Sequence, residues 1–482
     1  MTPKAVNKFN LLKVFLLLFI LADSCYAFYQ YYHLPLDGDL VPIVAPSEHY
    51  ASVLIDPFGI SVMKDHKEYA ATNRYFAHIT MVGYYKSFYQ FIAPFFKDKV
   101  KALYSISALF SIAVHVLLLF LSTVYICGHS KFWKTSFLLA MGILVPFFQI
   151  NGYYDSIGII DKSVTYTFFY ALPMALLLLF FLPFYLSYCH QKPIASYFKN
   201  WMWPLWILLA IYICFSGSQM APLVIIICPT VVLIHFYFKS KSFIKGNSTT
   251  LLFFFGFVLL LSVYSFYIGR FNIENGTPIP LMERYWKLAK GLPKFLTYKM
   301  AFAFMAILLL VNLVLLKKIK PNVFSSHAFK LIVMALLLCA AYLILLPLGG
   351  YRPYRPWIVR YDTFLPITMV LIFLLSLSSH FLLTSRKLTK PIRSYYTIFL
   401  ISILIVFQWS DCLPLKYDNS CQKEALSAIA NSNKSAIELS DDCTLLSWFI
   451  ISDPAYSKDI GKMLHFWGIS RQEIMFYQTD KN

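Results

Sequence analysis

The sequence predicts an all-α polytopic membrane protein, and three observations lead to this fold class. Of the 482 residues, 59% are hydrophobic and only 13% are charged, whereas a soluble chain carries about a quarter charged residues. The chain contains eleven apolar runs, most of them near the ~20 residues that a helix needs to cross a bilayer. The charged residues between these runs are divided unequally, which is typical of loops on opposite sides of a membrane.

The apolar runs are the predicted transmembrane helices. They lie near residues 10–28, 103–127, 136–150, 165–187, 201–217, 221–238, 250–269, 300–316, 329–347, 364–384 and 395–410. The run at 136–150 is short, and the runs at 201–217 and 221–238 are joined by only a brief turn. Short runs of this kind also suit re-entrant segments, so we expect eleven spans, give or take about two.

Division of the chain at these runs separates its charges. One set of loops carries 18 of the 42 Lys and Arg and none of the 23 acidic residues, and the other carries the remaining 24 with all of the acids. Short loops rich in Lys and Arg remain in the cytoplasm during insertion. The sequence thus predicts a cytoplasmic N-terminus, an outer C-terminus and carboxylate chemistry on the outer side. The net charge of +19 fits contact with anionic membrane lipids, and no nucleic acid is expected as a partner.

Outside the membrane, we expect loops of unequal length around a multi-span domain of residues 1–410. The outer segments are residues 28–102, 151–164, 270–299 and 348–363, followed by a C-terminal tail of residues 411–482. In the first outer loop, residues 67–85 and 84–96 are amphipathic, as are helices that lie flat in the membrane interface. The tail is polar enough to fold outside the membrane as a small α/β or irregular domain.

The nine cysteines include no C-x-x-C pair, so neither a zinc site nor a dithiol redox motif is indicated. Cys412, Cys421 and Cys443 fall in the outer tail, where a disulfide is stable. Three cysteines allow one bridge and leave one thiol over, and the sequence leaves the pairing open.

The sequence Asp37-Gly38-Asp39 places two carboxylates at a turn shortly after the first apolar run. Such a pair can hold a divalent cation such as Mg or Mn, or one carboxylate can act as a general base. The same residues also fit a plain Pro35/Gly38 turn with solvated acids, which is the commoner outcome for so short a motif. Its position just beyond the first span gives more weight to the chemical interpretation.

This position resembles that of the acidic motif in the GT-C superfamily of integral-membrane glycosyltransferases. Those enzymes have many spans, a cytoplasmic N-terminus and a long first outer loop with a D-x-D or related motif just beyond the first span. Asp37 and Asp39 match that placement. In length, first outer loop and outer tail, the chain is most similar to the phage-type serotype-converting O-antigen glucosyltransferases.

The resemblance implies an inverting sugar transfer at the inner (plasma) membrane of a bacterium. The donor would be a sugar on a polyprenyl phosphate, namely glucose by the resemblance to the glucosyltransferases, and the acceptor a periplasmic glycan such as O-antigen. Asp37 or Asp39 would deprotonate the attacking hydroxyl as the lipid phosphate leaves. Members with lipid monophosphate donors often work without a metal, so none is firmly predicted; any bound cation would take Asp37 and Asp39 as ligands.

A leaving phosphate needs cations, and an unusual outer loop at residues 349–362 contains them. The candidate residues there are Arg352, Arg355 and Arg360 for the phosphate, with Tyr351 and Tyr354 for the substrate. A guanidinium offers a planar fork of donors that matches phosphate oxygens, and the intervening prolines stiffen the loop. Alternatively, Arg and Tyr simply anchor a helix end at the interface. Short outer loops usually contain few Lys and Arg residues. Three arginines in this one therefore favour a role in binding phosphate or substrate.

Four further outer residues are weaker candidates. Tyr154 and Asp155 lie at the mouth of a pair of spans, where they would line a sugar site. Arg270 opens the second long outer loop and would bind the donor phosphate, and Arg74 in the first loop would contact substrate. Each also fits a plainer role as part of a polar turn or as an interfacial anchor.

Other functions fit parts of the sequence. A flippase for lipid-linked sugars would place ionisable residues in mid-membrane and break its helices with Gly or Pro. Here the span centres carry almost no charge, and Gly numbers only 17. An O-antigen polymerase or ligase also uses outer Arg-rich loops, but it commonly relies on one large loop late in the chain. The early D-G-D motif favours glycosyl transfer, with polymerase, ligase and flippase as alternatives.

Overall fold

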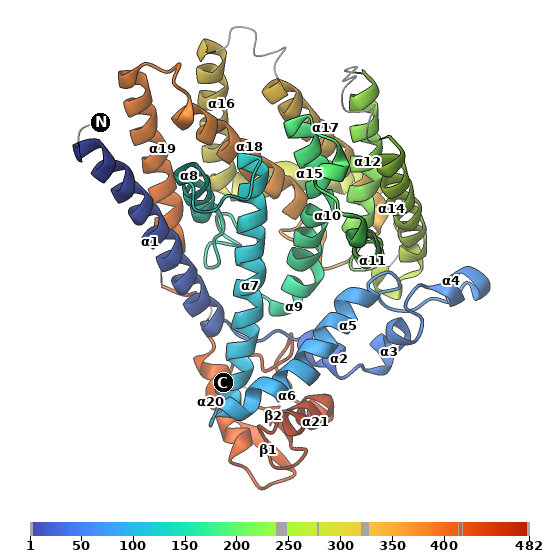
Figure 1. The fold of residues 1–482 in the computed structure, drawn as a ribbon. Helices are drawn as coiled ribbons and strands as arrows, with labels where there is room; N and C mark the ends of the chain where they lie inside the picture. The colour runs from blue at the N-terminus through green and yellow to red at the C-terminus, as the bar shows by residue number, and fades with distance from the viewer. Residues whose placement is uncertain are drawn as a thin grey trace.

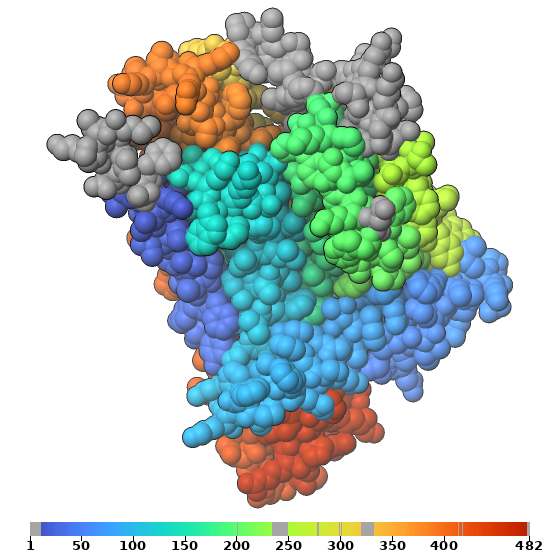
Figure 2. Space-filling model, viewed as in Figure 1, coloured from blue at the N-terminus to red at the C-terminus, as the bar shows by residue number. Residues whose placement is uncertain are grey.

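The computed structural model describes residues 3–237, 248–276, 279–319, 327–412, 414–416 and 418–479. It consists of a bundle of long helices with a smaller C-terminal domain beneath it, and helix α1 begins at the end of the bundle away from that domain (Figure 1 and Figure 2). Nearly all of the regular structure is helical. Within the described ranges, the strands are β1 (Ala436–Leu439) and β2 (Met475–Gln478).

Eight of the described helical segments are long and apolar enough to cross a membrane. They coincide, apart from residues at their ends, with the helices α1 (Pro3–His33), α7 (Lys99–Cys127), α10 (Leu172–His190), α14 (Ser248–Ile268), α16 (Met300–Ile319), α17 (His327–Leu345), α18 (Leu365–Thr384) and α19 (Lys390–Asp411). Three shorter apolar helices are α8 (Thr135–Leu144), α11 (Trp203–Cys214) and α12 (Met220–Tyr237). Every predicted run coincides with one of these helices, which fits a polytopic membrane protein. Whether the three shorter helices cross the membrane stays a prediction.

Helix α7 shows how local sequence sets the ends of a span. It begins after Asp98, whose carboxylate accepts hydrogen bonds from the backbone N–H of Val100 (2.9 Å) and Lys101 (3.1 Å), groups that have no partner within the helix. It ends at Gly128, whose φ of +68° is a left-handed conformation that suits glycine. Between these ends α7 packs against α1, α8 and α10, so it lies at the centre of this part of the bundle.

The first outer loop folds into short helices between the bundle and the C-terminal domain (Figure 1). They are α2 (Leu40–Val44), α3 (Glu48–Ile55), α4 (Ile60–Asp65), α5 (Tyr75–Gly83) and α6 (Tyr89–Ile92). A π-helical turn, η1 (Tyr84–Phe88), joins α5 to α6. The two amphipathic segments predicted at 67–85 and 84–96 therefore form one nearly continuous helix that begins only at Tyr75. A further outer helix, α15 (Leu281–Tyr298), fills much of the second long outer segment.

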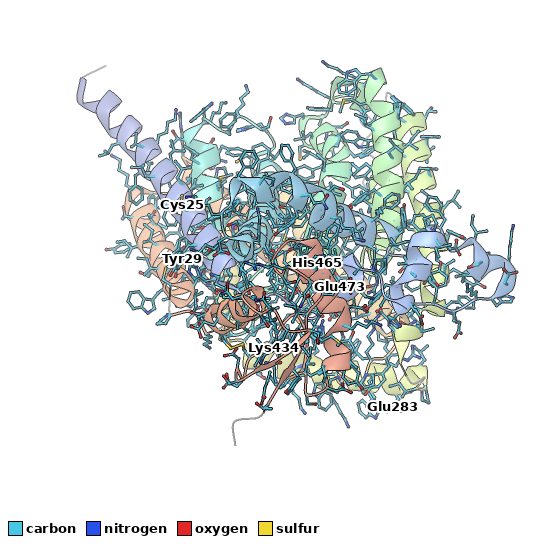
Figure 3. The ribbon with its side chains drawn as sticks, turned by 90° about the horizontal axis from the view of Figure 1, so that it is seen from below. Cys25, Tyr29, Glu283, Lys434, His465 and Glu473 are labelled. Atoms are coloured by element: carbon cyan, nitrogen blue, oxygen red, sulfur yellow. A yellow bond between two sulfur atoms is a disulfide. The ribbon has the colours of Figure 1, made fainter. Side chains whose placement is uncertain are left out.

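The C-terminal tail contains a small α/β unit, the tail domain (residues 418–479). Its elements are α20 (Ser420–Ala430), β1, α21 (Lys458–Phe466) and β2, and the two strands pair in parallel with Ala436 opposite Met475. A disulfide joins Cys421 to Cys443, which answers the pairing question that the sequence left open, and Cys412 is an exposed free thiol. Figure 3, seen from below, shows the tail domain lying across the middle of the bundle.

Buried polar contacts fasten the tail domain to the first outer loop. The side-chain amide of Gln422 accepts a hydrogen bond from the backbone N–H of Leu36 (2.8 Å) and donates one to its carbonyl (3.0 Å). The indole of Trp467 donates to the carbonyl of Tyr85 (3.0 Å), and the hydroxyl of Tyr89 donates to the carbonyl of Trp467 (2.8 Å). One cluster of buried apolar side chains also extends from the bundle through the first loop into the tail domain. The tail domain is thereby held against the chain on either side of the D-G-D motif.

Candidate functional site

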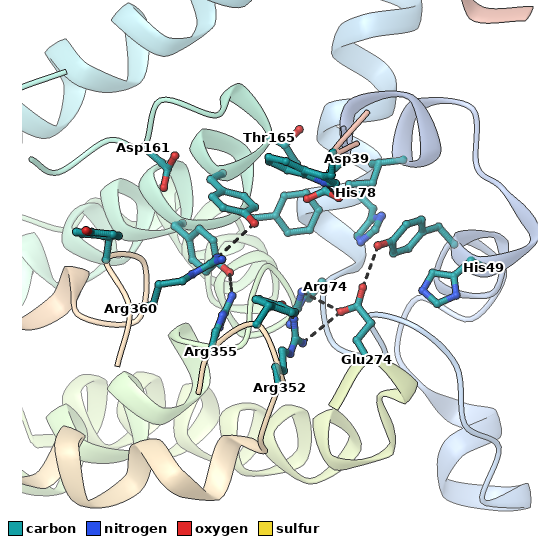
Figure 4. A pocket seen from close by; sticks show the side chains of 18 of the residues that line it. Asp39, His49, Arg74, His78, Asp161, Thr165, Glu274, Arg352, Arg355 and Arg360 are labelled. Carbon is teal, nitrogen blue, oxygen red and sulfur yellow. Dashed lines mark hydrogen bonds and ion pairs between the residues drawn. The ribbon is translucent and has the colours of Figure 1, made fainter. Parts of the chain in front are cut away.

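A cavity of about 820 Å³ lies where the first outer loop, the segment just before α10, the loop at 348–363 and the tail domain meet. This volume is within the range of small-molecule sites. Figure 4 shows charged side chains from several elements converging on it. The acidic and basic lining residues are Asp39, Arg74, Asp161, Glu274, Arg352, Arg355 and Arg360. The cavity thus brings together carboxylates and guanidinium groups from segments that are far apart in the sequence.

The two carboxylates of the D-G-D motif have different surroundings. Asp37 is buried and does not line the cavity. Its carboxylate accepts hydrogen bonds from the hydroxyls of Ser163 and Thr165 (both 2.7 Å) and from the backbone N–H of Thr165 (3.2 Å) and Asp39 (3.1 Å). These four donors occupy both of its oxygens. Asp37 therefore joins the D-G-D turn to the segment before α10. This leaves Asp39 as the carboxylate of the motif that can contact a substrate.

Asp39 is half-buried and faces the cavity. Its Oδ1 accepts a hydrogen bond of 2.8 Å from the indole Nε1 of Trp448, a residue of the tail domain. Burial and the neighbouring charge of Asp37 raise the pKa of Asp39 to about 6, although the Trp448 hydrogen bond opposes that rise. A carboxylate with a pKa near 6 is mostly ionised at neutral pH and is basic enough to accept a proton.

Gly38 is required by the close approach of the tail domain. A Cβ atom at this position would lie 2.5 Å from the carbonyl carbon of Ser447 and 2.5 Å from the backbone nitrogen of Trp448. Such contacts are far inside van der Waals distance, and they involve backbone atoms that cannot simply rotate away. The glycine between the two acids therefore lets the Trp448 loop pack directly on the motif.

On the opposite side of the cavity, Arg355 and Arg360 share one acid within their own loop. Asp362 is 1% exposed; it accepts two hydrogen bonds from Arg360, at 2.9 and 2.7 Å, and one from Arg355 at 2.6 Å. Burial alone would raise the pKa of Asp362, but the two guanidinium groups outweigh burial and hold this pKa well below its usual value. We call these three residues the Asp362 triad.

A second acid holds another pair of arginines from different segments of the chain. Glu274 accepts hydrogen bonds from Arg74 (3.4 Å) and Arg352 (3.2 Å), and its other oxygen accepts one from the hydroxyl of Tyr50 (2.9 Å). Burial raises the pKa of Glu274, but Arg74 and Arg352 outweigh it and lower the pKa to about 2. Glu274, Arg74 and Arg352 form the Glu274 triad.

Each triad contains two guanidinium groups and one carboxylate, so each contributes one excess positive charge to the cavity wall. The Nε atoms of Arg74 and Arg355 are buried and have no hydrogen-bond partner among the described residues. Buried donors without an acceptor are costly and uncommon in folded proteins. An anion at this wall would supply acceptors for donors of this kind and would neutralise the excess charge.

Aromatic residues from the segment just before α10 complete the wall. A π-helical turn, η4 (Thr167–Ala171), precedes α10, and turns of this type are frequent at functional sites. The hydroxyls of Tyr166 and Tyr170 lie 3.3 and 3.4 Å from Arg360 and Arg355 and accept hydrogen bonds from them. Nearby, the hydroxyl of Tyr154 donates to Asp161 (2.9 Å). Asp161 also lines the cavity, and burial raises its pKa to about 6.

Several predicted site residues line the cavity, and others do not. Tyr354 lines it, with its hydroxyl accepting a 2.6 Å hydrogen bond from Arg352. Arg270 instead lines a neighbouring cavity of about 700 Å³. Asp155 forms an ion pair with Lys416 and is not among the lining residues. Tyr351 is also absent from the lining and packs beneath Lys287 of α15, at 5.3 Å from its ring centre.

Glu274, His78 and Trp448 line the cavity but were not predicted as site residues, whereas Asp161, which also lines it, belongs to the outer segment predicted to line a sugar site. None belongs to a recognisable motif. Only Asp161 had a sequence signal, because it follows the polar segment at 151–155. His78 lies between the rings of Tyr50 and Phe169, and burial together with Arg74 lowers its pKa to about 3, so its imidazole is neutral.

The residues at this site do not fit a divalent cation held by the D-G-D pair. Both oxygens of Asp37 already accept hydrogen bonds inside the protein, which leaves Asp39 as the acid of the motif that faces the cavity. A metal ion needs several converging oxygen ligands. Among the residues that the structure describes, no three His, Cys, Asp or Glu side chains form a group that could hold a metal ion.

No family model matches the chain, and no curated protein sequence is significantly similar to it. The chemistry of the cavity itself is therefore the basis on which a function can be assigned.

Proposed function

We propose that the protein transfers a sugar from a polyprenyl-phosphate donor to a glycan acceptor on the outer side of the membrane, with inversion at the anomeric carbon. The observation that carries the proposal is that Asp39 lines the same cavity as the four arginines of the two triads, which lie grouped below it in the view of Figure 4. A carboxylate that can accept a proton and cations that can receive a phosphate are the groups that such a transfer requires.

In the proposed reaction, Asp39 acts as the general base. Its carboxylate takes the proton of the attacking hydroxyl while the hydroxyl oxygen bonds to the anomeric carbon and the bond from that carbon to the phosphate oxygen breaks. The pKa of about 6 suits this role at neutral pH. His78 is less suited, because a pKa of about 3 makes its imidazole a weak proton acceptor.

The two triads serve the leaving phosphate. Negative charge grows on the phosphate as the sugar departs, and preorganised guanidinium groups stabilise that charge in a site shielded from water. The excess positive charge of each triad supports this role. Tyr166 and Tyr170 help to orient the guanidinium groups by accepting hydrogen bonds from them.

The neighbouring cavity of about 700 Å³ offers the donor a route to these arginines. It shares Arg74, Arg352 and Arg355 with the first cavity. It is also lined by Leu281 at the start of α15 and by Leu348 at the end of the α17 segment. An amphipathic helix such as α15 suits the membrane interface, so a lipid phosphate would enter from the bilayer with its headgroup directed at the arginines.

The interior of the bundle gives less support to a flippase. A cavity of about 230 Å³ lies between α7, α10, α12, α17 and α18, and the described residues that line it are uncharged and mostly aliphatic. A sugar crossing the membrane would need hydrogen-bonding groups along its path. The charged cavity beside the tail domain suits a reaction on one side of the membrane better than passage across it.

The proposal places the protein in the inner membrane of a bacterium, with O-antigen or a similar glycan as acceptor. The test is a glycan analysis of host cells that carry either the intact gene or the Asp39→Asn variant, with the membrane abundance of each protein measured. We expect the intact gene to add one sugar per repeat, and the Asp39→Asn protein to be present and inactive. Altered chain length without an added sugar would favour a polymerase or ligase, and altered export a flippase.

A further inference from the structure

The tail domain presents a group of exposed aromatic rings directly beside the candidate base. Trp448 and Phe449 are each 56% exposed, and Tyr456 is 69% exposed. The rings of Phe449 and Tyr456 are perpendicular, with centres 6.1 Å apart. Trp448 also lines the cavity and donates its indole N–H to Asp39. The aromatic surface is therefore continuous with the site where the proposed reaction takes place.

We infer that Trp448 and Phe449 form the acceptor subsite, where a pyranose ring of the glycan stacks with its hydroxyl directed at Asp39. This inference rests on the proposed function and adds the residues that select and hold the acceptor. One face of a pyranose carries several C–H groups with partial positive charge, and the face of an aromatic ring is negative. Stacking therefore fixes the plane of the sugar, while its hydroxyls stay free for hydrogen bonds.

The structure holds the Trp448 loop rigidly, as a subsite that orients a hydroxyl requires. The backbone of Ser447 and Trp448 packs on Gly38 with no room for a side chain between them. Leu446 adopts a left-handed conformation, with φ of +51°, which surrounding contacts must maintain. The disulfide at Cys443 lies just upstream of this turn and ties it to α20. Stacking on a loop held in this way costs little further ordering.

The charges around these rings favour a sugar over a lipid surface. Residues 440–453 contain Asp441, Asp442 and Asp453 and no Lys or Arg. Membrane surfaces carry anionic headgroups that attract basic segments and repel acidic ones. Carboxylates next to aromatic rings, in contrast, can accept hydrogen bonds from sugar hydroxyls. The tail domain also lies beyond the first outer loop, on the side away from the bundle (Figure 1).

The test measures transfer kinetics with the full-length protein purified in detergent. Radiolabelled glucosyl polyprenyl phosphate is the donor, and lipid-free O-antigen polysaccharide is the varied acceptor. We expect Phe449→Ala to raise the acceptor KM about tenfold, the scale of one lost ring contact, and to leave the donor KM unchanged. Trp448→Ala should raise the acceptor KM and also lower kcat, whereas Trp448→Phe keeps a ring and should mainly lower kcat. Phe466→Ala, at a 41% exposed aromatic on α21, is the matched control and should change neither.

Calorimetric binding of the same polysaccharide, without donor, separates this inference from the proposed function. If the wild-type protein transfers sugar and the acceptor KM is unchanged in Phe449→Ala and Trp448→Ala, the acceptor subsite is overturned and the proposed transferase function stands. Protein that binds polysaccharide through these rings but transfers no sugar would keep the subsite and refute the transferase. Binding that is absent in wild type, or equal in wild type and Trp448→Ala, would also overturn the subsite.

Discussion

The two walls of the cavity use their charged residues in opposite ways. On the arginine wall, each acid belongs to a triad whose two guanidinium groups leave one positive charge in excess. On the carboxylate wall, Asp39 faces the cavity, whereas its neighbour Asp37 lies outside the lining and is committed to hydrogen bonds inside the protein. A charged residue in a sequence motif is thus not always available to a ligand. Its hydrogen-bond and ion-pair partners in the fold decide whether it is.

The largest effect should come from breaking the carboxylate wall at Asp39. Asp39→Asn removes the proposed base and keeps the shape of the side chain, so we expect transfer to fall by a factor of about 10²–10⁴ with normal membrane abundance. Asp37→Asn should act differently, because it disturbs the hydrogen bonds to Ser163 and Thr165 and so reduces abundance. Turnover per folded molecule, measured for both variants, checks the contrast. Full activity in Asp39→Asn would exclude it as the base.

The next largest effect concerns the acids of the arginine wall. Asp362→Asn leaves two partly buried guanidinium groups, with 14% and 26% of their side chains accessible, without their buried counter-ion. The loss of one partner costs about 3–5 kcal/mol in fully buried pairs, which sets the upper bound here. Glu274→Gln should cost less, because Glu274 is more exposed than Asp362, with 17% against 1% of its side chain accessible. Thermal unfolding of the purified proteins in detergent measures the difference. Equal losses would mean that the two triads are equally important to the fold.

The two triads also show what a sequence can predict about a site. Arg355, Arg360 and Asp362 lie within one loop, the acid being seven positions from Arg355, so the arginines could be recognised together. Glu274 is 200 positions from Arg74 and 78 from Arg352, and no local pattern connects the three. The contact between Asp39 and Trp448 spans 409 positions. The arginines of one loop were therefore predictable from sequence, whereas Glu274 and Trp448 were not, because only the fold brings them to their partners.

The same reasoning explains why the helical architecture was easier to predict than the site. The apolar character of a span is a property of consecutive residues, and each predicted run coincides with a helix. A local pattern could not decide which of two neighbouring aspartates faces a cavity, because their partners at Ser163, Thr165 and Trp448 come from elsewhere in the chain.

The pH dependence of transfer should identify which carboxylate acts as base. Asp39 must be ionised, and its pKa is raised to about 6, so activity should rise with pH through about 6. One pH unit below the pKa, only about a tenth of the groups are ionised, and activity should fall in proportion. Trp448→Phe removes a hydrogen bond that lowers this pKa. The acid limb, which is the fall of activity toward low pH, should therefore move to higher pH in this variant.

The control for this profile is Asp161→Asn, because burial also raises the pKa of Asp161 to about 6. The other charges near Asp39 are those of Asp37, Glu274 and Arg360, and this variant leaves them in place. We therefore expect the acid limb to keep its position in Asp161→Asn. A limb that disappears in this variant would transfer the role of base from Asp39 to Asp161.

A smaller effect should follow when an arginine of the arginine wall is replaced by lysine, which keeps the charge and changes the shape of the charged group. Arg352 bonds to both Glu274 and Tyr354, and lysine cannot reproduce a planar fork of donors. Arg352→Lys should raise the donor KM by about tenfold and leave the acceptor KM unchanged, a loss of about 1.4 kcal/mol in donor binding. Arg270→Lys, in the neighbouring cavity, should change the donor KM by less. An equal rise of the donor KM in Arg270→Lys and Arg352→Lys would place the donor phosphate nearer to Arg270 than proposed.

The smallest effect is expected at predicted residues that the fold directs away from both walls. Asp155 pairs with Lys416, and their side chains are 43% and 55% exposed, a kind of ion pair worth about 0–1 kcal/mol. Asp155→Asn should therefore change kcat, both KM values and unfolding temperature only slightly. Asp155 lies six positions before Asp161 in the same outer segment, but only Asp161 lines the cavity. Unchanged activity in Asp155→Asn, together with reduced activity in Asp161→Asn, would show that a position in the cavity, and not in the segment, makes a residue part of the site. A loss of activity in Asp155→Asn at normal abundance would instead extend the acceptor path toward Lys416 and the start of the tail.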